Sequence, residues 1–266
     1  MTPAEQSLQA GNLQETLAHL QNQVRKDPAN SSLRIFLFQL LVILGEWDRA
    51  LTQLNVAGEL DAANLTMVQT YREAIRCEVL RKEIFSGHKT PLVFGDPEQW
   101  IALLQEALKL SATHQNQQAN NLRNQAFEMA PTRAGFIDGQ PFEWIADADT
   151  RLGPMLEAIV NGRYYWIPFH QICAIQIEKP ADLRDMVWMP AHFEWVNGGE
   201  VVGLIPTRYP ASETSVDSAV RLARKTEWQE QSDQLFIGLG QRVLTTNDND
   251  YALLNIREIQ FTVNQP

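Results

Sequence analysis

The chain has 266 residues, of which 44% are hydrophobic and 20% are charged, and its formal net charge is -10. This length and composition are typical of a soluble globular protein with one large domain or two modest ones. The net negative charge argues against non-specific binding to nucleic acid or to an anionic membrane, since both require a basic face.

The sequence carries no targeting or membrane signal. The N-terminus lacks a basic segment followed by an apolar one, so no signal peptide is predicted. The longest apolar run, Leu40 to Leu44, is far shorter than the roughly 20 residues of a membrane span. The two cysteines, Cys77 and Cys173, are typical of free thiols in a reducing compartment rather than of a disulfide framework. We therefore expect a cytoplasmic protein.

The first part of the chain contains a repeat. Gly11-Asn12-Leu13 and Gly45-Glu46-Trp47 lie 34 residues apart, and the apolar residues that follow them match at the same offset. This period is typical of tetratricopeptide helix pairs, which stack because one pair cannot bury its apolar face alone. An ordinary pair of helical hairpins is the alternative.

Helical patterns continue to about residue 130. An apolar stripe runs through Asn64 to Phe85, and Asp96-Pro97 is typical of an N-cap followed by the first helical residue. A last helix is predicted over Gln118–Met129. We therefore predict an all-α, tetratricopeptide-like domain over residues 1–130.

The second part, residues 131–266, has the pattern of short strands joined by turns. Asp138-Gly139 and Asn197-Gly198-Gly199 lie between apolar segments, and each predicts a β-hairpin. The other predicted elements are a helix over Val216–Trp228 and strands over Leu235–Leu244 and Tyr251–Val263. The predicted fold class is α+β, with a helical repeat domain followed by an α+β domain rich in short antiparallel strands.

The stretch from Phe142 to Pro168 joins the two parts and is rich in acids, arginines and aromatic residues. Gly153-Pro154 predicts the start of a short helix, and Asn161-Gly162 predicts its end. The residues between them, Met155 to Val160, have apolar side chains at helical spacing.

The same stretch holds a candidate catalytic cluster. Glu143, Asp147 and Asp149 could hold a divalent metal or act in acid–base catalysis, with Arg151 nearby. We favour the structural interpretation, in which these carboxylates cap a turn and pair with arginine.

A second polar group follows later in the chain. It contains Arg208, Arg221, Arg224 and Lys225, and it either pairs internally with the acidic turn or takes an anionic partner. Elsewhere we find no metal-binding spacing, no phosphate-binding glycine loop and no nucleophile elbow. We predict no cofactor and no metal.

Several long segments resemble one protein family. They are FEWIADADTRLGPMLEAIVNGRYYWIPF (Phe142–Phe169), DLRDMVWMPA (Asp182–Ala191), IPTRYP (Ile205–Pro210), LARKTEW (Leu222–Trp228) and GLGQR (Gly238–Arg242). They resemble the ImpE or SciE-type family, whose members are also called TagJ and are accessory proteins of type VI secretion systems.

The resemblance implies a non-enzymatic cytoplasmic adaptor without catalytic residues. It implies binding to the N-terminal helix of the small sheath subunit TssB, and a link to the ClpV ATPase that disassembles the contracted sheath. Neither nucleic acid nor membrane is an expected partner.

We expect a hydrophobic groove that accepts an amphipathic helix, either on the repeats or at the joint between the two parts. The predicted contact residues at the joint are Trp144, Asp147, Asp149, Arg151, Tyr165, Trp166 and Arg208. Two alternatives are a metal-assisted hydrolase that uses Glu143, Asp147 and Asp149, and a purely structural scaffold such as an oligomerisation module.

Overall fold

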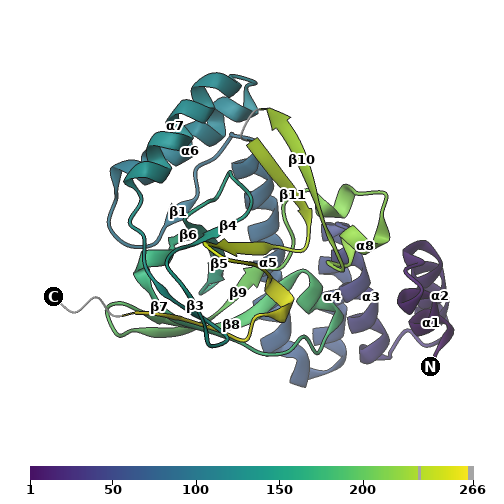
Figure 1. The fold of residues 1–266 in the computed structure, drawn as a ribbon. Coiled ribbons are helices and arrows are strands. Elements are labelled where there is room, and N and C mark those ends of the chain that lie inside the picture. The colour runs from purple at the N-terminus through teal and green to yellow at the C-terminus, as the bar shows by residue number, and fades with distance from the viewer. Residues whose placement is uncertain (233–234, 263–266) are drawn as a thin grey trace.

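The computed structural model describes residues 1–232 and 235–262 (Figure 1). The helices are α1 (Pro3–Gln9), α2 (Leu13–Lys26), α3 (Ser31–Ile43), α4 (Trp47–Leu60), α5 (Leu65–Phe85), α6 (Gln99–Ala112), α7 (Asn116–Met129) and α8 (Ser218–Arg221). Short 3-10 helices are η1 (Ala62–Asn64), η2 (Phe169–Gln171), η3 (Leu183–Met186), η4 (Ser212–Thr214) and η5 (Leu253–Asn255). None of the described helices has the length and apolar character needed to cross a bilayer.

The first helices form hairpins with the predicted 34-residue offset. Gly11 and Gly45, at φ 81° and 73°, end the first helix of each pair in a left-handed conformation that favours glycine. Helix α2 begins at Leu13 and α4 begins at Trp47. In Figure 1 helices α1 to α5 stand beside one another along one side of the strands.

Helix α3 lies inside the molecule. Every residue from Leu37 to Ile43 is buried, which is expected of a helix that is apolar on all sides. Helix α4 covers one side of it, and η3 from the second part of the chain covers another. Helix α5 then packs against the strands, where it contacts β6 (Arg163–Pro168).

The strands form one large sheet, one small sheet and a hairpin. In spatial order, the large sheet contains β1 (Leu92–Val93), β6, β5 (Met155–Val160), β9 (Glu200–Pro206), β8 (Trp188–Trp195), β7 (Ile172–Ile177), β14 (Glu258–Phe261), β2 (Gly135–Ile137) and β3 (Gln140–Phe142). The small sheet contains β13 (Asp250–Ala252), β12 (Val243–Thr246) and β4 (Ile145–Asp147). The hairpin, called the arm below, pairs β10 (Thr226–Ser232) with β11 (Leu235–Gly240).

The centre of the large sheet is buried on both faces. One hydrophobic cluster joins the repeat helices to Ile159, Trp166 and Trp188 of the sheet, and a second cluster lies between the opposite face and the small sheet. Strand β1, from the helical part, pairs in parallel with β6 at one edge. The division into residues 1–130 and 131–266 stays a prediction, because the two parts share this core and this sheet.

Both hairpins predicted from turn sequences are present. Asp138 and Gly139, at φ 48° and 81°, join β2 to β3. The turn at Asn197–Gly199 joins β8 to β9, and Glu194 pairs with Glu200 beside it. These turns need backbone conformations that favour Asn, Asp and Gly, so the local sequence is sufficient to predict them.

The predicted helix over Met155–Val160 is wrong, because this segment is strand β5. Asn161 and Gly162, at φ 50° and 72°, form the tight turn into β6 instead of ending a helix. All six residues of β5 are buried. A short apolar run covered on both faces has no alternation, so its periodicity does not distinguish a strand from a helix.

Other predicted boundaries also differ. Helix α6 begins at Gln99 instead of Pro97, because Glu98, at φ -116° and ψ 146°, is still extended. The helix expected over Val216–Trp228 is only α8, since the chain becomes β10 at Thr226.

The last two predicted strands are each divided. Gly240, at φ 90°, ends β11, two residues lie between it and the start of β12 at Val243, and η5 lies between β13 and β14. Val263, the end of the predicted final strand, lies outside the described residues.

Candidate functional site

Glu157 is the centre of a buried ionic network where helices and sheets meet. It lies on β5, is fully buried, and points toward the repeat helices. Arg81 of α5 donates to both carboxylate oxygens, from Nε to Oε1 at 2.6 Å and from Nη2 to Oε2 at 2.7 Å. The Tyr164 hydroxyl and Arg242 Nη2 also donate to this carboxylate. The junction network, as we call it, consists of Arg81, Asp147, Glu157, Tyr164, Tyr209 and Arg242.

Arg242 extends the junction network into the small sheet. Its guanidinium bridges Glu157 and Asp147, and its Nε donates to Pro206 O at 2.9 Å. Asp147 also accepts the Tyr209 hydroxyl at 3.0 Å. The network thus links helix α5, the large sheet, the small sheet and the loop after β9.

Two guanidinium groups and two carboxylates balance the charge of this network. Burial by itself would raise the pKa of Glu157, but Arg81 and Arg242 outweigh burial and lower this pKa to about 2. Burial raises the pKa of Asp147 to about 7, because Arg242, which it shares with Glu157, offsets the lost hydration only in part. Removing Glu157, which both guanidinium groups bind, leaves an uncompensated charge in the interior.

Asp147 should make stability fall as pH rises. Its folded pKa of about 7 lies above the ordinary value of 3.8, so the folded state holds its proton more tightly than the unfolded state does. Between about pH 4 and pH 7, the wild type should therefore lose unfolding free energy relative to Asp147→Asn, by on the order of 3 kcal/mol. Urea unfolding of both proteins at several pH values measures this, and parallel pH profiles would contradict it.

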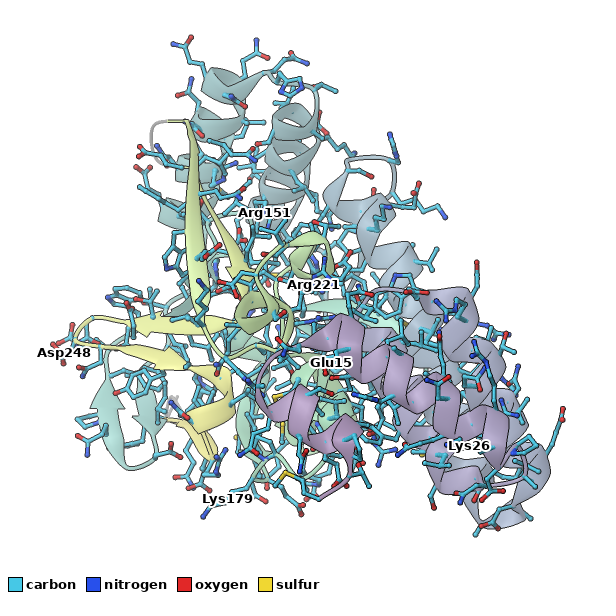
Figure 2. The ribbon with its side chains drawn as sticks, turned by 90° about the vertical axis from the view of Figure 1, so that its right-hand side faces the viewer. Glu15, Lys26, Arg151, Lys179, Arg221 and Asp248 are labelled. Carbon is cyan, nitrogen blue, oxygen red and sulfur yellow. The ribbon has the colours of Figure 1, made fainter. Side chains whose placement is uncertain are left out.

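The turn after β4 is held by a second carboxylate. Asp149 is fully buried and accepts Arg151 N and Gly238 N, at 2.9 and 3.0 Å. The Arg151 guanidinium pairs with Asp149 and lies 4.8 Å from the centre of the Phe85 ring. This turn therefore joins α5 to strand β11 of the arm; Figure 2 labels Arg151.

The basic residues of the second half bind within the chain. Arg208 donates to Ile43 O at 2.9 Å and Val42 O at 3.2 Å, so a cation lies at the C-terminal end of α3. Burial lowers the pKa of Arg208 to about 10, which leaves it charged at neutral pH. Arg224 donates to Leu8 O at 3.3 Å, and Lys225 pairs with Asp217 at 2.6 Å. Figure 2 shows Arg221 near Glu15 of α2, with which it lines a shallow pocket.

An apolar pocket lies beside the junction network. Its volume is about 430 Å³, and Asp147 forms part of its wall. The apolar side chains that line this pocket, called the Trp144 pocket below, are Phe127, Ala130, Pro131, Trp144, Ile145, Ala146, Ala148 and Pro154. Gly153, at φ 52°, lets the turn approach α7, since a Cβ there would lie 2.4 Å from the Phe127 ring. Trp144 is 37% exposed at the pocket.

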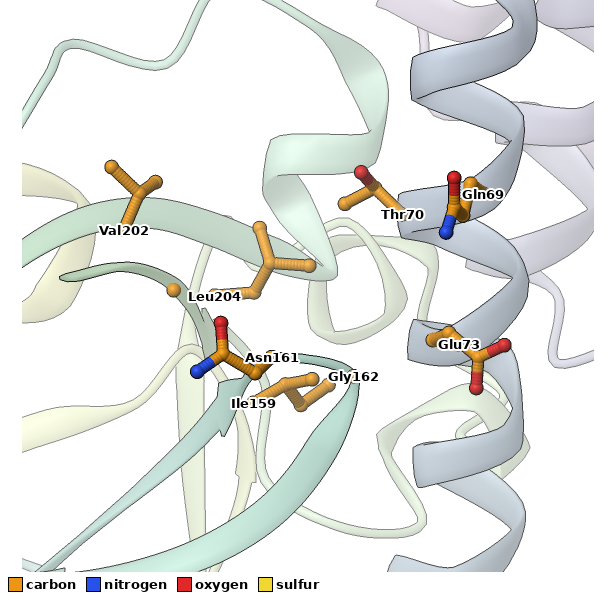
Figure 3. A pocket seen from close by; sticks show the side chains of 9 residues that line it. Gln69, Thr70, Glu73, Ile159, Asn161, Gly162, Val202 and Leu204 are labelled. Atoms are coloured by element: carbon orange, nitrogen blue, oxygen red, sulfur yellow. The ribbon is translucent and has the colours of Figure 1, made fainter.

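Two other pockets have more polar walls. The pocket in Figure 3, of about 400 Å³, lies between α5 and the β5–β6 turn, with Thr70 and Glu73 on one side and Asn161 and Leu204 on the other. A third pocket, of about 260 Å³, lies next to the junction network and is lined in part by Glu78, Arg81 and Arg151. Among residues 1–232 and 235–262, no group of three or more His, Cys, Asp or Glu side chains is placed to hold a metal ion.

Comparisons with known proteins agree with this architecture. The family model described as ImpE protein matches residues 139–260, and a tetratricopeptide repeat model matches residues 7–74. The type VI secretion system accessory component TagJ of Pseudomonas aeruginosa is 50% identical over 258 residues, which cover 97% of this chain and 90% of that protein. The chain belongs to the ImpE family. The crystal structure of VPA1032 from Vibrio parahaemolyticus has a TM-score of 0.89 and 25% identity, covering 98% of each chain.

The predicted fold of this ImpE-family protein is confirmed, both in its tetratricopeptide-like helices and in its strand-rich second part. Its repeats, however, are covered on their inner side. Trp188 lies 6.1 Å from the ring of Trp47 and 5.8 Å from that of Tyr71, and η3 packs on α3. Helical repeats usually offer a concave face to partners. Here Trp188 and η3, which lie within the ImpE match over residues 139–260, pack against the repeat helices.

The seven predicted contact residues differ in how far they are buried. Asp147, Asp149, Arg151, Trp166 and Arg208 are buried and bind within the chain. Tyr165 is half-buried on the other face of β6, against Phe94. Trp144 remains accessible. That these residues contact a partner stays a prediction, and among them Trp144 is the most accessible to one.

Most of the junction network does not follow from local sequence patterns. Glu157, Arg81, Tyr164, Tyr209 and Arg242 were not among the predicted site residues. Glu157 carried a usable signal, since an acid within the otherwise apolar segment Met155–Val160 indicates a buried charge with a partner. Its partners Arg81 and Arg242, 76 and 85 residues away, follow from no local pattern.

Proposed function

We propose that this protein is a non-catalytic accessory adaptor of a type VI secretion system, acting in the cytoplasm. The observation that carries the proposal is the 50% identity to the accessory component TagJ over 97% of the chain. The tetratricopeptide match supports a role in binding proteins, because such repeats act as protein-binding scaffolds.

Within this role, we propose that the chain binds the N-terminal helix of the small sheath subunit TssB through the Trp144 pocket. The pocket volume of about 430 Å³ suits the anchoring side chains of an amphipathic helix. Glu128 and Glu143, next in sequence to the pocket residues Phe127 and Trp144, are exposed. These acids favour a helix whose polar face is basic.

By holding this helix, the adaptor would modulate ClpV-dependent disassembly of the contracted sheath. A sheath disassembly assay with ClpV, run with and without the protein, tests this step. An unchanged disassembly rate would leave the protein as a binder of the sheath subunit without influence on ClpV.

Calorimetric titration with the N-terminal helix peptide of the cognate TssB tests the binding itself. We expect a dissociation constant in the micromolar range, about -8 kcal/mol, as is common for a short helix in a groove. Absence of binding to a folded sample would overturn the partner assignment.

Trp144→Ala should weaken this binding about 30-fold, or about 2 kcal/mol, because aromatic anchors at the centre of an interface carry most of its energy. Phe136→Ala is the matched control, since Phe136 is also an exposed aromatic residue but lies outside the pocket. Titration of both variants separates the pocket from a general effect of losing an exposed ring. Equal affinities would place the helix elsewhere on the protein.

The contacts of the acidic cluster do not favour the metal-assisted hydrolase alternative. The carboxylates of Asp147 and Asp149 already accept hydrogen bonds from arginine and backbone amide groups. Glu143 is exposed on the surface instead of joining them.

A further inference from the structure

The arm presents an accessible strand edge. Strand β10 pairs with β11 on one side, and within residues 1–232 and 235–262 no strand pairs with its other side. Residues Glu227 to Gln231 are all exposed. Figures 1 and 2 show the arm standing out from the large sheet. A strand of this kind can accept another strand unless the protein protects it.

The register of the arm shows which amides face outward. Gln241 N donates to Lys225 O at 3.0 Å, so the residue pair 225/241 is hydrogen-bonded. In an antiparallel ladder, hydrogen-bonded and non-hydrogen-bonded residue pairs alternate. The pairs 227/239 and 229/237 are therefore hydrogen-bonded, whereas the pairs 228/238 and 230/236 are not. The backbone N–H and C=O groups of Trp228 and Glu230 therefore point away from β11, along the free edge.

On the other side of the arm, outward backbone groups of β11 form hydrogen bonds with the body of the protein. Phe236 N donates to Thr150 Oγ1 at 3.0 Å, and Gly238 N donates to Asp149 Oδ2 at 3.0 Å. Thr150 N in turn donates to Phe236 O at 3.1 Å. The outer edge of β11 is thus fixed to the body of the protein, while the equivalent groups of β10 face solvent.

We propose that β10 binds an extended basic segment of another protein, which adds to the arm as a third strand. Backbone hydrogen bonds to Trp228 and Glu230 would hold the segment, as in other cases of strand addition. The exposed side chains from Glu227 to Gln231 include two acids and no base.

Lys225 pairs with Glu227 at 2.7 Å, which leaves the Glu230 carboxylate to face a basic residue across the new strand pair. The net charge of -10 disfavours a second copy of this chain in the same place.

The probe is a synthetic peptide of about seven residues, the length of β10, that alternates lysine with valine. Amide hydrogen exchange of the full-length protein is measured with and without it. At about ten times the dissociation constant, exchange at Trp228 and Glu230 should slow about tenfold. A peptide with glutamate in place of lysine should give little protection.

Glu230→Pro is the decisive variant. It removes an outward amide without removing a hydrogen bond between β10 and β11, and proline is tolerated on such an edge. We expect about tenfold weaker peptide binding, whereas Glu227→Gln, with its amide directed inward, should bind within about twofold of the wild type. Glu230→Lys should reverse the preference between the two peptides.

Three results would overturn the proposal. The first is peptide binding without protection of Trp228 and Glu230. The second is binding that Glu230→Pro leaves unchanged. The third is a wild-type dimer in sedimentation that Glu230→Pro converts to a monomer, because the occupant would then be a second copy. None of these readouts depends on the sheath subunit, so they stand apart from the test of the adaptor function.

Discussion

Glu157→Ala is expected to lower the free energy of unfolding by about 3–5 kcal/mol, because a buried ion pair that loses one partner leaves an uncompensated charge. Arg81 and Arg242 would then face each other in the interior without the carboxylate that both now bind. Chemical denaturation measured by tryptophan fluorescence gives the change directly.

The charge of Glu157 also predicts a pH dependence. Its folded pKa, about 2, lies below the ordinary value of 4.5, so the stabilisation is complete above pH 4.5 and is lost as the pH falls through about 2. The difference between wild type and Glu157→Gln should therefore shrink in acid. Glu143→Gln is the matched control, since this exposed acid should change stability by less than about 0.5 kcal/mol. Similar losses for the two glutamine variants would show that the junction network does not stabilise the fold.

Trp188→Ala should destabilise the protein by about 3–5 kcal/mol, the range found when a buried tryptophan is truncated. Trp188 is fully buried against Tyr71 and Trp47 of the repeat helices, and its Nε1 donates to Glu78 at 2.9 Å. Truncation leaves a cavity between the two parts and removes this donor from Glu78. Burial raises the pKa of Glu78, which means that the charged carboxylate is poorly solvated. Loss of the Trp188 donor therefore removes one of the hydrogen bonds that stabilise this charge.

The same variant tests how the inner face of the repeats is covered. Hydrogen exchange in α3 and α5 should become faster in Trp188→Ala than in wild type, since the contact that closes this face is lost. Trp144→Ala serves as the control, because Trp144 is partly exposed and its loss should change stability by about 1 kcal/mol or less. Unchanged exchange in α3 and α5 would mean that η3 and Arg208 close the face without Trp188.

Local sequence determined the helical repeats and the turns. The spacing of Gly11 and Gly45 fixes the period of the first helices, and each glycine adopts the left-handed conformation that its position requires. Asp138-Gly139 and Asn197-Gly198-Gly199 predict their hairpins for the same reason. These features depend on residues close together in the chain. Long segments such as Phe142–Phe169 were also sufficient to indicate the ImpE family, which the comparisons confirm.

Tertiary structure decided the form of Met155–Val160 and the partners of its acid. This segment is buried on both faces, between the repeat helices and the small sheet, so neither a helical nor a strand period is imposed on its side chains. Glu157 is bound by Arg81 and Arg242, which precede and follow it by 76 and 85 residues. A charge is stable in the interior only where opposite charges meet it, and the packing of α5 and the small sheet against β5 decides where that happens.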